Sequence, residues 1–595
     1  VEIYSRIINL QNTIMSELDF SNPPKIIATD GIAQIEVFSA NEPNTKELQY
    51  RKGFINGKET LKPVDLIVKG GLPSWLKGEF FTIGQSTYDI KYTKMIGTEE
   101  GYESATATFS MGHWFDGLPL VNRFAINGTN NKINYRSRLT SKKHETKIRD
   151  SHGIVTKHPF SLFKTNPNQT PLAKLIRTKR TTKPELEPCS ANISTNYPYN
   201  KPGEKPKIYC QNHASQVVEL DAYDLTPTRV FSWDELDPMI KGDHASPHSH
   251  FDETTGELIN FNMEYHTMGT TYNFFSVSQN NQNVQLIGSV TARMSYVHSF
   301  GVTPRYIILV LFPYYGKSSG INFTWSDNIV DSFEFKPNEP TLFYVISREK
   351  KQHVATYKSD PCFAFHHINA FEDDNNNLYL DIACYDNSDI LNDLELENLR
   401  KGLPGGLQMA EVRRFVLQNI QQGSLKFANI PQATRMGNLQ NMVSSMIWSR
   451  STNQDSSPWP IADYVRCADS TLELPRINPR YQRLRYRYVY GIGLSAKGGL
   501  ENQIWDSLVK CDLDVKEAVA MWSSENCYPS EAIFVPHPEK DSEEDDGVLL
   551  SIVFDSENDK SFLLVLDART MSELVRTYLP QVVPLSFGHG AFKRN

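Results

Sequence analysis

Four of the 15 histidines occur in similar contexts, beside small or turn-forming residues and next to a segment with strand character. They are His248 in SPHSHFDE, His298 in SYVHSFGVTP, His366 in FAFHHINAF and His589 in SFGHGAF. Neutral imidazole is a good ligand for first-row divalent metal ions. Four imidazoles on one octahedral ion leave two adjacent positions free, which can hold dioxygen next to a substrate. Because a single histidine of this kind is more often structural, the prediction of a metal site requires all four to meet.

Two glutamates are candidates for balancing the charge of such a centre, which has no anionic ligand. Glu473 lies in LELPRINP and Glu531 in YPSEAIFVPHP, both at the edges of predicted strands. A carboxylate that accepts the second ring N–H of a ligating histidine supplies negative charge and fixes the tautomer. The sequence therefore predicts a metal centre with outer carboxylates, no catalytic side chain beyond the metal centre and no organic cofactor.

Short strand-like runs must position these residues. GEFFTIG, ELINFNMEY, RYIILVLF, NLYLDIACY and GVLLSIVF are rich in β-branched and aromatic residues and are separated by Asn, Asp, Gly or Pro. Many such runs over 595 residues, without a βαβ rhythm, favour a β-propeller or stacked sandwiches. The four histidines are separated by 50, 68 and 223 residues. In a propeller this spacing fits neighbouring blades followed by several blades that contribute no ligand, with all four rings meeting at the axis.

Two segments give sharper predictions of local structure. The apolar run from Ile307 to Phe312 is far too short to span a bilayer and has the right length for a strand buried on both faces. Helical periodicity is sparse, and its best example is 388–402, where Gly402 can end a helix.

Composition narrows the class of protein. The chain is 39% hydrophobic and 22% charged with a net charge of −8, which argues against nucleic-acid binding. No stretch approaches the roughly 20 apolar residues of a membrane helix, and the N-terminus has no signal-peptide pattern. Seven scattered cysteines without a CxxC pair predict free thiols in a reducing compartment. We therefore expect a cytoplasmic protein that associates peripherally with membranes or lipid bodies.

Residues 141–183 contain 11 Lys or Arg residues and only two acidic residues, Glu145 and Asp150. A solvated insertion is one interpretation. A patch that meets an anionic membrane surface is the other, since such surfaces attract Lys and Arg.

The chain resembles the carotenoid cleavage oxygenase family from about residue 63 to its end. That family includes the β-carotene oxygenases and the retinoid isomerase of the retinal pigment epithelium. The resemblance is carried by LPSWLKGEFF, GHWFDGLPLVNRF, SPHSHFDETTGE, SYVHSFGVTP, FHHINAFED, ELPRIN, YPSEAIFVPHP and FGHGAFK. It implies an all-β fold: a seven-bladed β-propeller over 63–595, with a cap of helices and loops over a nonpolar tunnel. Residues 1–62 would then be an N-terminal extension that packs on the propeller.

The resemblance also implies one Fe(II) per chain, held on the propeller axis by the four histidines that match the family's ligands: His248, His298, His366 and His589. In the pairs HSH and HH the first histidine matches, so His250 and His367 are not chosen. The family's outer carboxylates match Glu473 and Glu531.

A third family glutamate falls within KIYCQNHASQVVEL, where the matched residue is Asn212. An asparagine can accept a hydrogen bond from an imidazole N–H but adds no negative charge. We therefore expect one ligand histidine to lack its carboxylate partner.

The implied function is a non-haem Fe(II) dioxygenase. It would use dioxygen to cleave a conjugated C=C bond of a carotenoid or apocarotenoid into aldehyde or ketone products. Three alternatives remain: cleavage of a stilbene-type phenolic alkene, retinoid ester isomerohydrolase-like activity, and a non-catalytic carotenoid-binding propeller. LEPCSAN keeps Pro188 and Cys189 of a vertebrate pattern but lacks its lysine, which weakens the isomerohydrolase alternative. The expected partners are an apolar polyene and a membrane surface, with no nucleic acid.

Overall fold

The computed structural model describes residues 26–29, 32–35 and 48–594, except 99–100, 155–161, 163–182, 198–202, 267–268, 280–282, 321–322, 324–327, 421–458, 496–503 and 540. The chain divides into two compact units, Val1–Leu48 and Gln49–Asn595. The first contains a hairpin of β1 (Ile26–Thr29) and β2 (Ile32–Ile35). Residues 49–62 belong to the second unit, while the predicted packing of residues 1–48 on the propeller stays a prediction.

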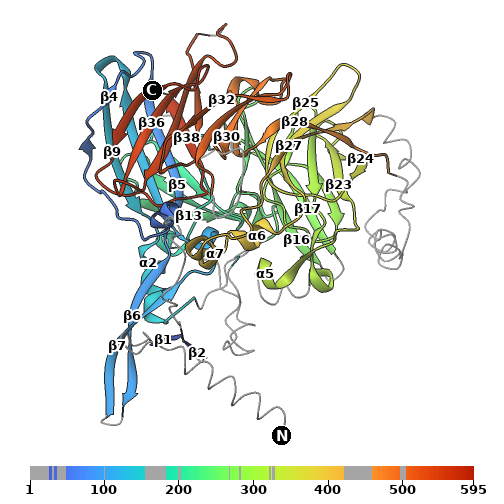
Figure 1. Cartoon of the computed structure of the whole chain (residues 1–595). Helices are drawn as coiled ribbons and strands as arrows, with labels where there is room; N and C mark the ends of the chain where they lie inside the picture. Colours follow the sequence, from blue (N-terminus) through green and yellow to red (C-terminus); the bar gives the residue numbers. More distant parts are fainter. Residues whose placement is uncertain are drawn as a thin grey trace. The chain divides into compact units, whose positions relative to one another are not determined.

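Seven antiparallel sheets of four or more strands form the described part of the second unit, each sheet being one blade of a β-propeller (Figure 1). The first blade contains β10 (Asn192–Ser194), β11 (Lys207–Gln211), β12 (Gln216–Asp221) and β13 (Pro227–Ser232). The second contains β14 (His244–Ala245), β15 (His250–Asp252), β16 (Glu257–His266), β17 (Gly269–Ser278) and β18 (Val284–Ala292). The third contains β19 (Gly301–Val302), β20 (Tyr306–Leu311), β23 (Thr341–Ser347) and β24 (Gln352–Ser359).

The other four blades complete the ring, and the sixth and seventh also use strands from the start of the second unit. The fourth contains β25 (Phe363–Glu372), β26 (Leu378–Tyr385), β27 (Glu411–Leu417) and β28 (Asp463–Thr471). The fifth contains β29 (Glu473–Arg476), β30 (Tyr488–Gly493), β31 (Ser507–Asp512) and β32 (Glu517–Ser523). The sixth contains β33 (Cys527–Pro529), β34 (Ile533–Pro536), β35 (Gly547–Asp555), β36 (Lys560–Asp567), β37 (Glu573–Tyr578) and β4 (Lys69–Gly70). The seventh contains β3 (Val64–Asp65), β9 (Lys132–Leu139), β8 (Leu118–Asn127), β5 (Lys77–Thr87) and β38 (Gly590–Arg594). The all-β, seven-bladed prediction is thereby confirmed.

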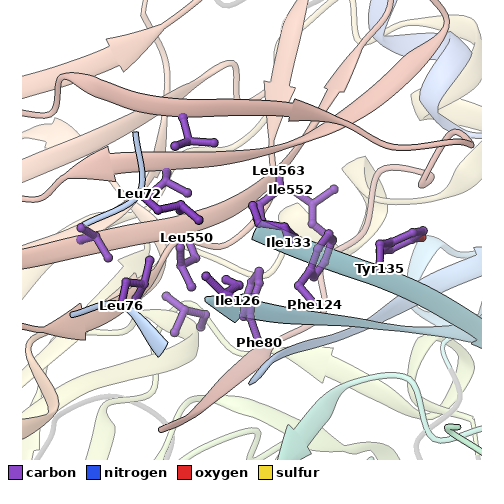
Figure 2. Packing of buried hydrophobic residues seen from close by; sticks show 14 of the residues in the cluster. Leu72, Leu76, Phe80, Phe124, Ile126, Ile133, Tyr135, Leu550, Ile552 and Leu563 are labelled. Atoms are coloured by element: carbon purple, nitrogen blue, oxygen red, sulfur yellow. The ribbon is translucent and has the colours of Figure 1, made fainter. Parts of the chain in front are cut away.

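Two pairings between the ends of the second unit close the ring. The C-terminal β38 pairs with β5, and β4 pairs with β37. Buried side chains from the sixth and seventh blades pack across this seam, with labelled contributions from β5, β8, β9, β35 and β36 (Figure 2). They recur at every second position, as in Phe124 and Ile126 or Leu550 and Ile552, because alternate side chains of a strand share a face. Each such side chain contributes about 1.5–3 kcal/mol when it leaves water, so the seam itself stabilises the closed ring.

Helices are few among the described residues, and they lie with the long β6–β7 hairpin on one side of the blades (Figure 1). The α-helices are α2 (Lys142–Asp150), α5 (Ile329–Ser332), α6 (Ile390–Asp393) and α7 (Leu396–Lys401). The 3-10 turns are η1 (Gln49–Gly53), η2 (Trp114–Asp116), η3 (Gly128–Asn130), η4 (Pro184–Leu186), η5 (Trp233–Glu235), η6 (Lys317–Gly320) and η7 (Pro479–Tyr481). The additional hairpins are β6 (Asp89–Thr98) with β7 (Gly101–Ser110), and β21 (Tyr314–Gly316) with β22 (Phe333–Phe335).

The helix predicted over 388–402 forms as two short helices instead, α6 and α7. The break comes at Leu394 and Glu395, whose backbone turns outward: the N–H of Trp114 donates to the carbonyl of Leu394, and Glu395 forms a bridge with His113. Gly402 ends α7 as predicted, with a φ of 114° that favours glycine.

The apolar run forms β20, in which Ile307 to Leu311 are at most 1% exposed, so the doubly buried strand is confirmed. All seven cysteines are free and buried. Across the described residues, no helix combines the length and the apolar character needed to cross a bilayer.

Candidate metal centre

The four predicted histidines meet at one point of the propeller. One ring nitrogen each of His248, His298, His366 and His589 lies within 4.8 Å of the corresponding nitrogen of the other three. The two Nε2 atoms of His248 and His298 are 2.9 Å apart, and those of His366 and His589 are 3.2 Å apart. Two nitrogens bound at about 2.1 Å to one ion and at right angles would be about 3.0 Å apart. The four rings therefore fit around a single metal ion.

The convergence follows from the topology of the blades. Each histidine lies in or just before a strand at the edge of its sheet: β15, β19, β25 and β38 for His248, His298, His366 and His589. These strands belong to the second, third, fourth and seventh blades, whose edges face one another around the axis. The spacing of 50, 68 and 223 residues thus reflects three successive blades and then a gap of two.

Hydrogen bonds to the backbone fix three of these segments. The hydroxyl of Ser246 donates to the carbonyl of His298 (2.7 Å) and accepts from the N–H of His248 (3.0 Å), which joins the second and third blades. The N–H of His589 donates to the carbonyl of Ala191 (3.1 Å), and its carbonyl accepts from Ile83 (3.0 Å). The ligand rings are therefore held by the β-framework rather than by a flexible loop.

Both predicted glutamates contact the outer nitrogens of the cluster. Glu473 Oε2 lies 2.7 Å from His366 Nδ1, and Glu531 Oε1 lies 2.6 Å from His589 Nδ1. A carboxylate accepts, so each Nδ1 carries the proton and each Nε2 lone pair remains directed at the common centre. The hydroxyl of Tyr385 also donates to Glu473 (2.9 Å).

Glu531 pairs with the guanidinium of Arg476 as well as with the ring of His589. Burial alone would raise its pKa, but the guanidinium of Arg476 and the ring of His589 lower it to about 2. Arg476 Nε donates to Glu531 Oε1 at 2.7 Å. Glu531 is therefore ionised at neutral pH and supplies a full negative charge beside the cluster.

The structure corrects the third outer position by one residue. Asn212 does not contact a ligand ring: its Oδ1 accepts from the N–H of Ala214 (2.8 Å), and its amide donates to the carboxylate of Glu187. The next residue, His213, places Nε2 2.8 Å from His298 Nδ1. The two residues are adjacent in the turn between β11 and β12, and only the tertiary structure shows which one faces the axis.

The neighbouring histidines that the sequence comparison set aside bind other groups. His250 Nε2 donates to the carbonyl of Phe300 (2.9 Å), and His367 Nδ1 pairs with the hydroxyl of Ser299 (2.7 Å). His366 lies at a bulge, because the pairing of β25 with β26 shifts register on both sides of His367. A bulge can redirect a side chain, which explains how adjacent histidines reach different partners.

A cavity of about 90 Å³ opens onto the cluster. Its apolar wall includes Met111, Phe115, Leu118, Leu162 and Phe587, and it reaches the rings of His298 and His589. Aromatic rings extend this wall, since Phe587 lies 5.3 Å from Phe115 and 5.7 Å from His366 between ring centroids. The polar side chains of Asp116, His144 and Asn212 also line the cavity. The site therefore combines a metal-binding cluster with a mainly apolar chamber.

Comparison with known proteins identifies the family. The chain is 28% identical to a carotenoid dioxygenase of Neurospora crassa, covering 89% of this chain and 88% of that protein. It is 25% identical to a torulene dioxygenase of Gibberella fujikuroi, covering 86% and 88%. The cobalt-substituted apocarotenoid oxygenase of Synechocystis shares the fold, with a TM-score of 0.68 at 17% identity over 92% of this chain and 98% of that one. Residues 54–594 match the retinal pigment epithelial membrane protein family. The chain thus belongs to this family of carotenoid oxygenases and is an enzyme of the carotenoid dioxygenase kind.

Proposed function

We propose that this enzyme is an Fe(II)-dependent dioxygenase that cleaves a conjugated C=C bond of a carotenoid or apocarotenoid into two carbonyl products. The observation that supports this most directly is the convergence of four imidazole nitrogens at an apolar cavity. The names of the related proteins support the substrate class.

The residues that would hold the iron are His248, His298, His366 and His589. Iron held there would supply the activation of dioxygen for addition across the double bond. Glu473 and Glu531 hold the Nδ1 protons of two ligand rings, which keeps their Nε2 lone pairs available and prevents the rings from rotating.

The chamber would bind and orient the polyene. Phe115 and Phe587 offer aromatic faces to an extended conjugated chain, and the apolar wall excludes water from the reacting bond. Which double bond is cleaved then depends on how far the chain extends past the cluster. No side chain is needed to transfer a proton.

The alternatives differ in what they require of the cavity. A phenolic alkene needs polar partners such as a Tyr–Lys pair, but neither residue type occurs among the described residues that line the cavity. A non-catalytic propeller would not need four histidines and two carboxylates in ligating geometry. Cleavage of a carotenoid or apocarotenoid therefore fits the site best.

The test is to load the purified chain with iron and incubate it with β-carotene, an apocarotenal and resveratrol under air. We expect about one iron per chain and carbonyl fragments from a polyene, identified by mass. Products only from resveratrol, or no carbonyl fragments from either polyene, would contradict the proposal.

Two matched pairs of variants test the ligand set. His248→Ala and His366→Ala should lose iron and cleavage, whereas His250→Ala and His367→Ala should retain measurable iron, because their rings bind Phe300 and Ser299 instead. Iron content is measured on each purified variant. Loss of iron in the His250 variant together with retention in the His248 variant would show that the assignment is wrong.

We also propose that the enzyme takes its substrate from a membrane surface without spanning the membrane. Carotenoids are nearly insoluble in water, so a polyene must pass from a lipid phase to the cavity. The basic segment 141–183 and the exposed apolar side chains of Met95 and Tyr102 on the β6–β7 hairpin support this contact.

A further inference from the structure

We infer that His213 is a positioning residue for the metal centre: its neutral imidazole orients the ligand His298, where His366 and His589 are oriented by carboxylates. This inference rests on the proposed iron site. The geometry that supports it is the distance of 2.8 Å between His213 Nε2 and His298 Nδ1. The other two outer contacts, at 2.7 and 2.6 Å, come from Glu473 and Glu531.

The proton positions follow from the geometry. His298 Nε2 faces the cluster, 2.9 Å from His248 Nε2, so its lone pair is needed there. Its proton therefore lies on Nδ1 and is donated to His213 Nε2, which must be an acceptor. The hydroxyl of Tyr296 also lies 3.1 Å from the same Nδ1.

The backbone around His213 holds its ring in place. The carbonyl of His213 accepts from the N–H of Ala245 (2.9 Å), which ties the turn between β11 and β12 to the second blade. Asn212 closes the same turn through the N–H of Ala214. The ring centroid lies 4.8 Å from that of His298 and 5.2 Å from that of Tyr296. His213 is therefore a fixed support and not a mobile surface group.

The difference in charge between the imidazole of His213 and a carboxylate affects which oxidation state of the metal is favoured. Glu473 and Glu531 place two negative charges around a 2+ ion, and an imidazole acceptor adds none. A third carboxylate would stabilise the 3+ ion more than the 2+ ion, because the added attraction grows with the charge of the metal. With His213 in this position, the centre favours ferrous iron and should resist oxidation by air.

The first experiment measures metal binding without using turnover. The apo form of the full chain is titrated with Co(II), and the d–d absorption bands and the apparent Kd are recorded. His213→Ala should weaken Co(II) binding by roughly 10–100-fold and shift the bands, since outer partners of metal ligands typically have effects of this size. His213→Glu should bind Co(II) at least as tightly as the wild type does.

The matched control is His353→Gln, far from the cluster in β24, where His353 contacts Ala355 and Thr356. It should bind Co(II) as the wild type does. Thermal melting of each apo variant separates a loss of metal affinity from a loss of folding. If His213→Ala fails to fold, His213→Gln and His213→Leu are compared instead. His213→Gln retains a hydrogen-bond acceptor and should keep most of the Co(II) affinity. His213→Leu has no acceptor and should lose it.

The second experiment measures the reduction potential of the iron-loaded proteins. His213→Glu should have a more negative potential than the wild type and should oxidise faster in air. Equal Co(II) affinity in wild type and His213→Ala, or an unchanged potential in His213→Glu, would overturn the inference while leaving the iron site intact. A wild type that binds neither Co(II) nor Fe(II) would instead overturn the proposed function, and this inference with it.

Discussion

At the scale of residues, burial favours the neutral form of three ligand rings. It lowers the pKa of His248 and His298 well below the usual range and also lowers that of His589, although Glu531 opposes the last shift. The neutral ring is the form that binds a metal. The same burial lowers the pKa of His213 to about 3, which agrees with its role as an uncharged acceptor.

Glu187 is a second buried carboxyl group whose state differs from that of Glu531. Burial raises its pKa to about 7, and the hydrogen bond from Asn212 only partly offsets the shift. The folded chain therefore holds a proton that the unfolded chain releases above the ordinary value of 4.5. The contribution of Glu187 to the free energy of unfolding therefore falls as pH rises from 4.5 to 7 and stays level above that range.

We expect Glu187→Gln to remove this loss of stability with rising pH. The variant should match the wild type at pH 4.5 and be more stable at pH 8, by an amount on the order of 3 kcal/mol. The neutral amide keeps an acceptor for Asn212 and cannot ionise. Melting curves at the two pH values check the prediction, and a stability difference that is the same at both would contradict it.

At the scale of elements, the approach of β38 to the axis depends on a close backbone contact at Gly588. A Cβ there would lie 2.0 Å from the carbonyl oxygen of Ile83 and 2.8 Å from the Cα of Gly84. Neither atom belongs to a flexible side chain, so the strand itself would have to move. His589 follows directly, and its displacement would open the cluster.

Gly588→Ala should therefore lower the stability by about 1–3 kcal/mol and also weaken metal binding. Gly405→Ala is the control, because a Cβ at that position meets nothing within 4 Å. Thermal melting and Co(II) titration of both variants test the prediction. A Gly588 variant that melts and binds Co(II) like the control would show that β38 can shift without cost.

At the scale of the whole molecule, the contact with a membrane divides into charged and apolar parts. Within the basic segment, α2 uses Lys142, Lys143 and Arg149 in ion pairs with Glu59, Glu185 and Glu145. These charges are partly neutralised within the molecule. Four further basic residues of this segment, Lys174, Arg177, Lys179 and Arg180, lie outside the described residues.

The apolar part is the tip of the β6–β7 hairpin. Met95 is 62% exposed and Tyr102 is 79% exposed, and Ile96 lies between them on the same hairpin. We expect the chain to sediment with anionic liposomes, and high salt to weaken this binding without abolishing it.

Two variants separate the contributions. Reversing the four charges at 174–180 to Glu should remove the salt-sensitive part, at about 1 kcal/mol per charge. Replacing Met95, Ile96 and Tyr102 by Ser should remove the salt-resistant part. Turnover of detergent-dispersed substrate serves as the control and should be largely unchanged in both. Liposome binding that neither variant alters would leave both segments as solvated surface.

The sequence by itself determined the periodic and the chemical features of this protein. Residue types and turn residues predict the β-strands, including the fully buried β20, because strand formation depends on local patterns of apolar and β-branched residues. The histidines and the glutamates stand in motifs whose order and spacing resemble one family. That resemblance indicated the propeller and the metal centre together.

Only the tertiary structure decided where individual side chains point. The bulge in β25 separates His366 from His367, and the turn before β12 turns His213 rather than Asn212 towards the axis. The helix predicted over 388–402 breaks where its backbone binds the segment at Trp114. Each of these outcomes depends on a contact between residues far apart in the chain, and a shift of one position reverses the direction of a side chain. Local sequence patterns do not determine such contacts, so these outcomes could not be predicted from them.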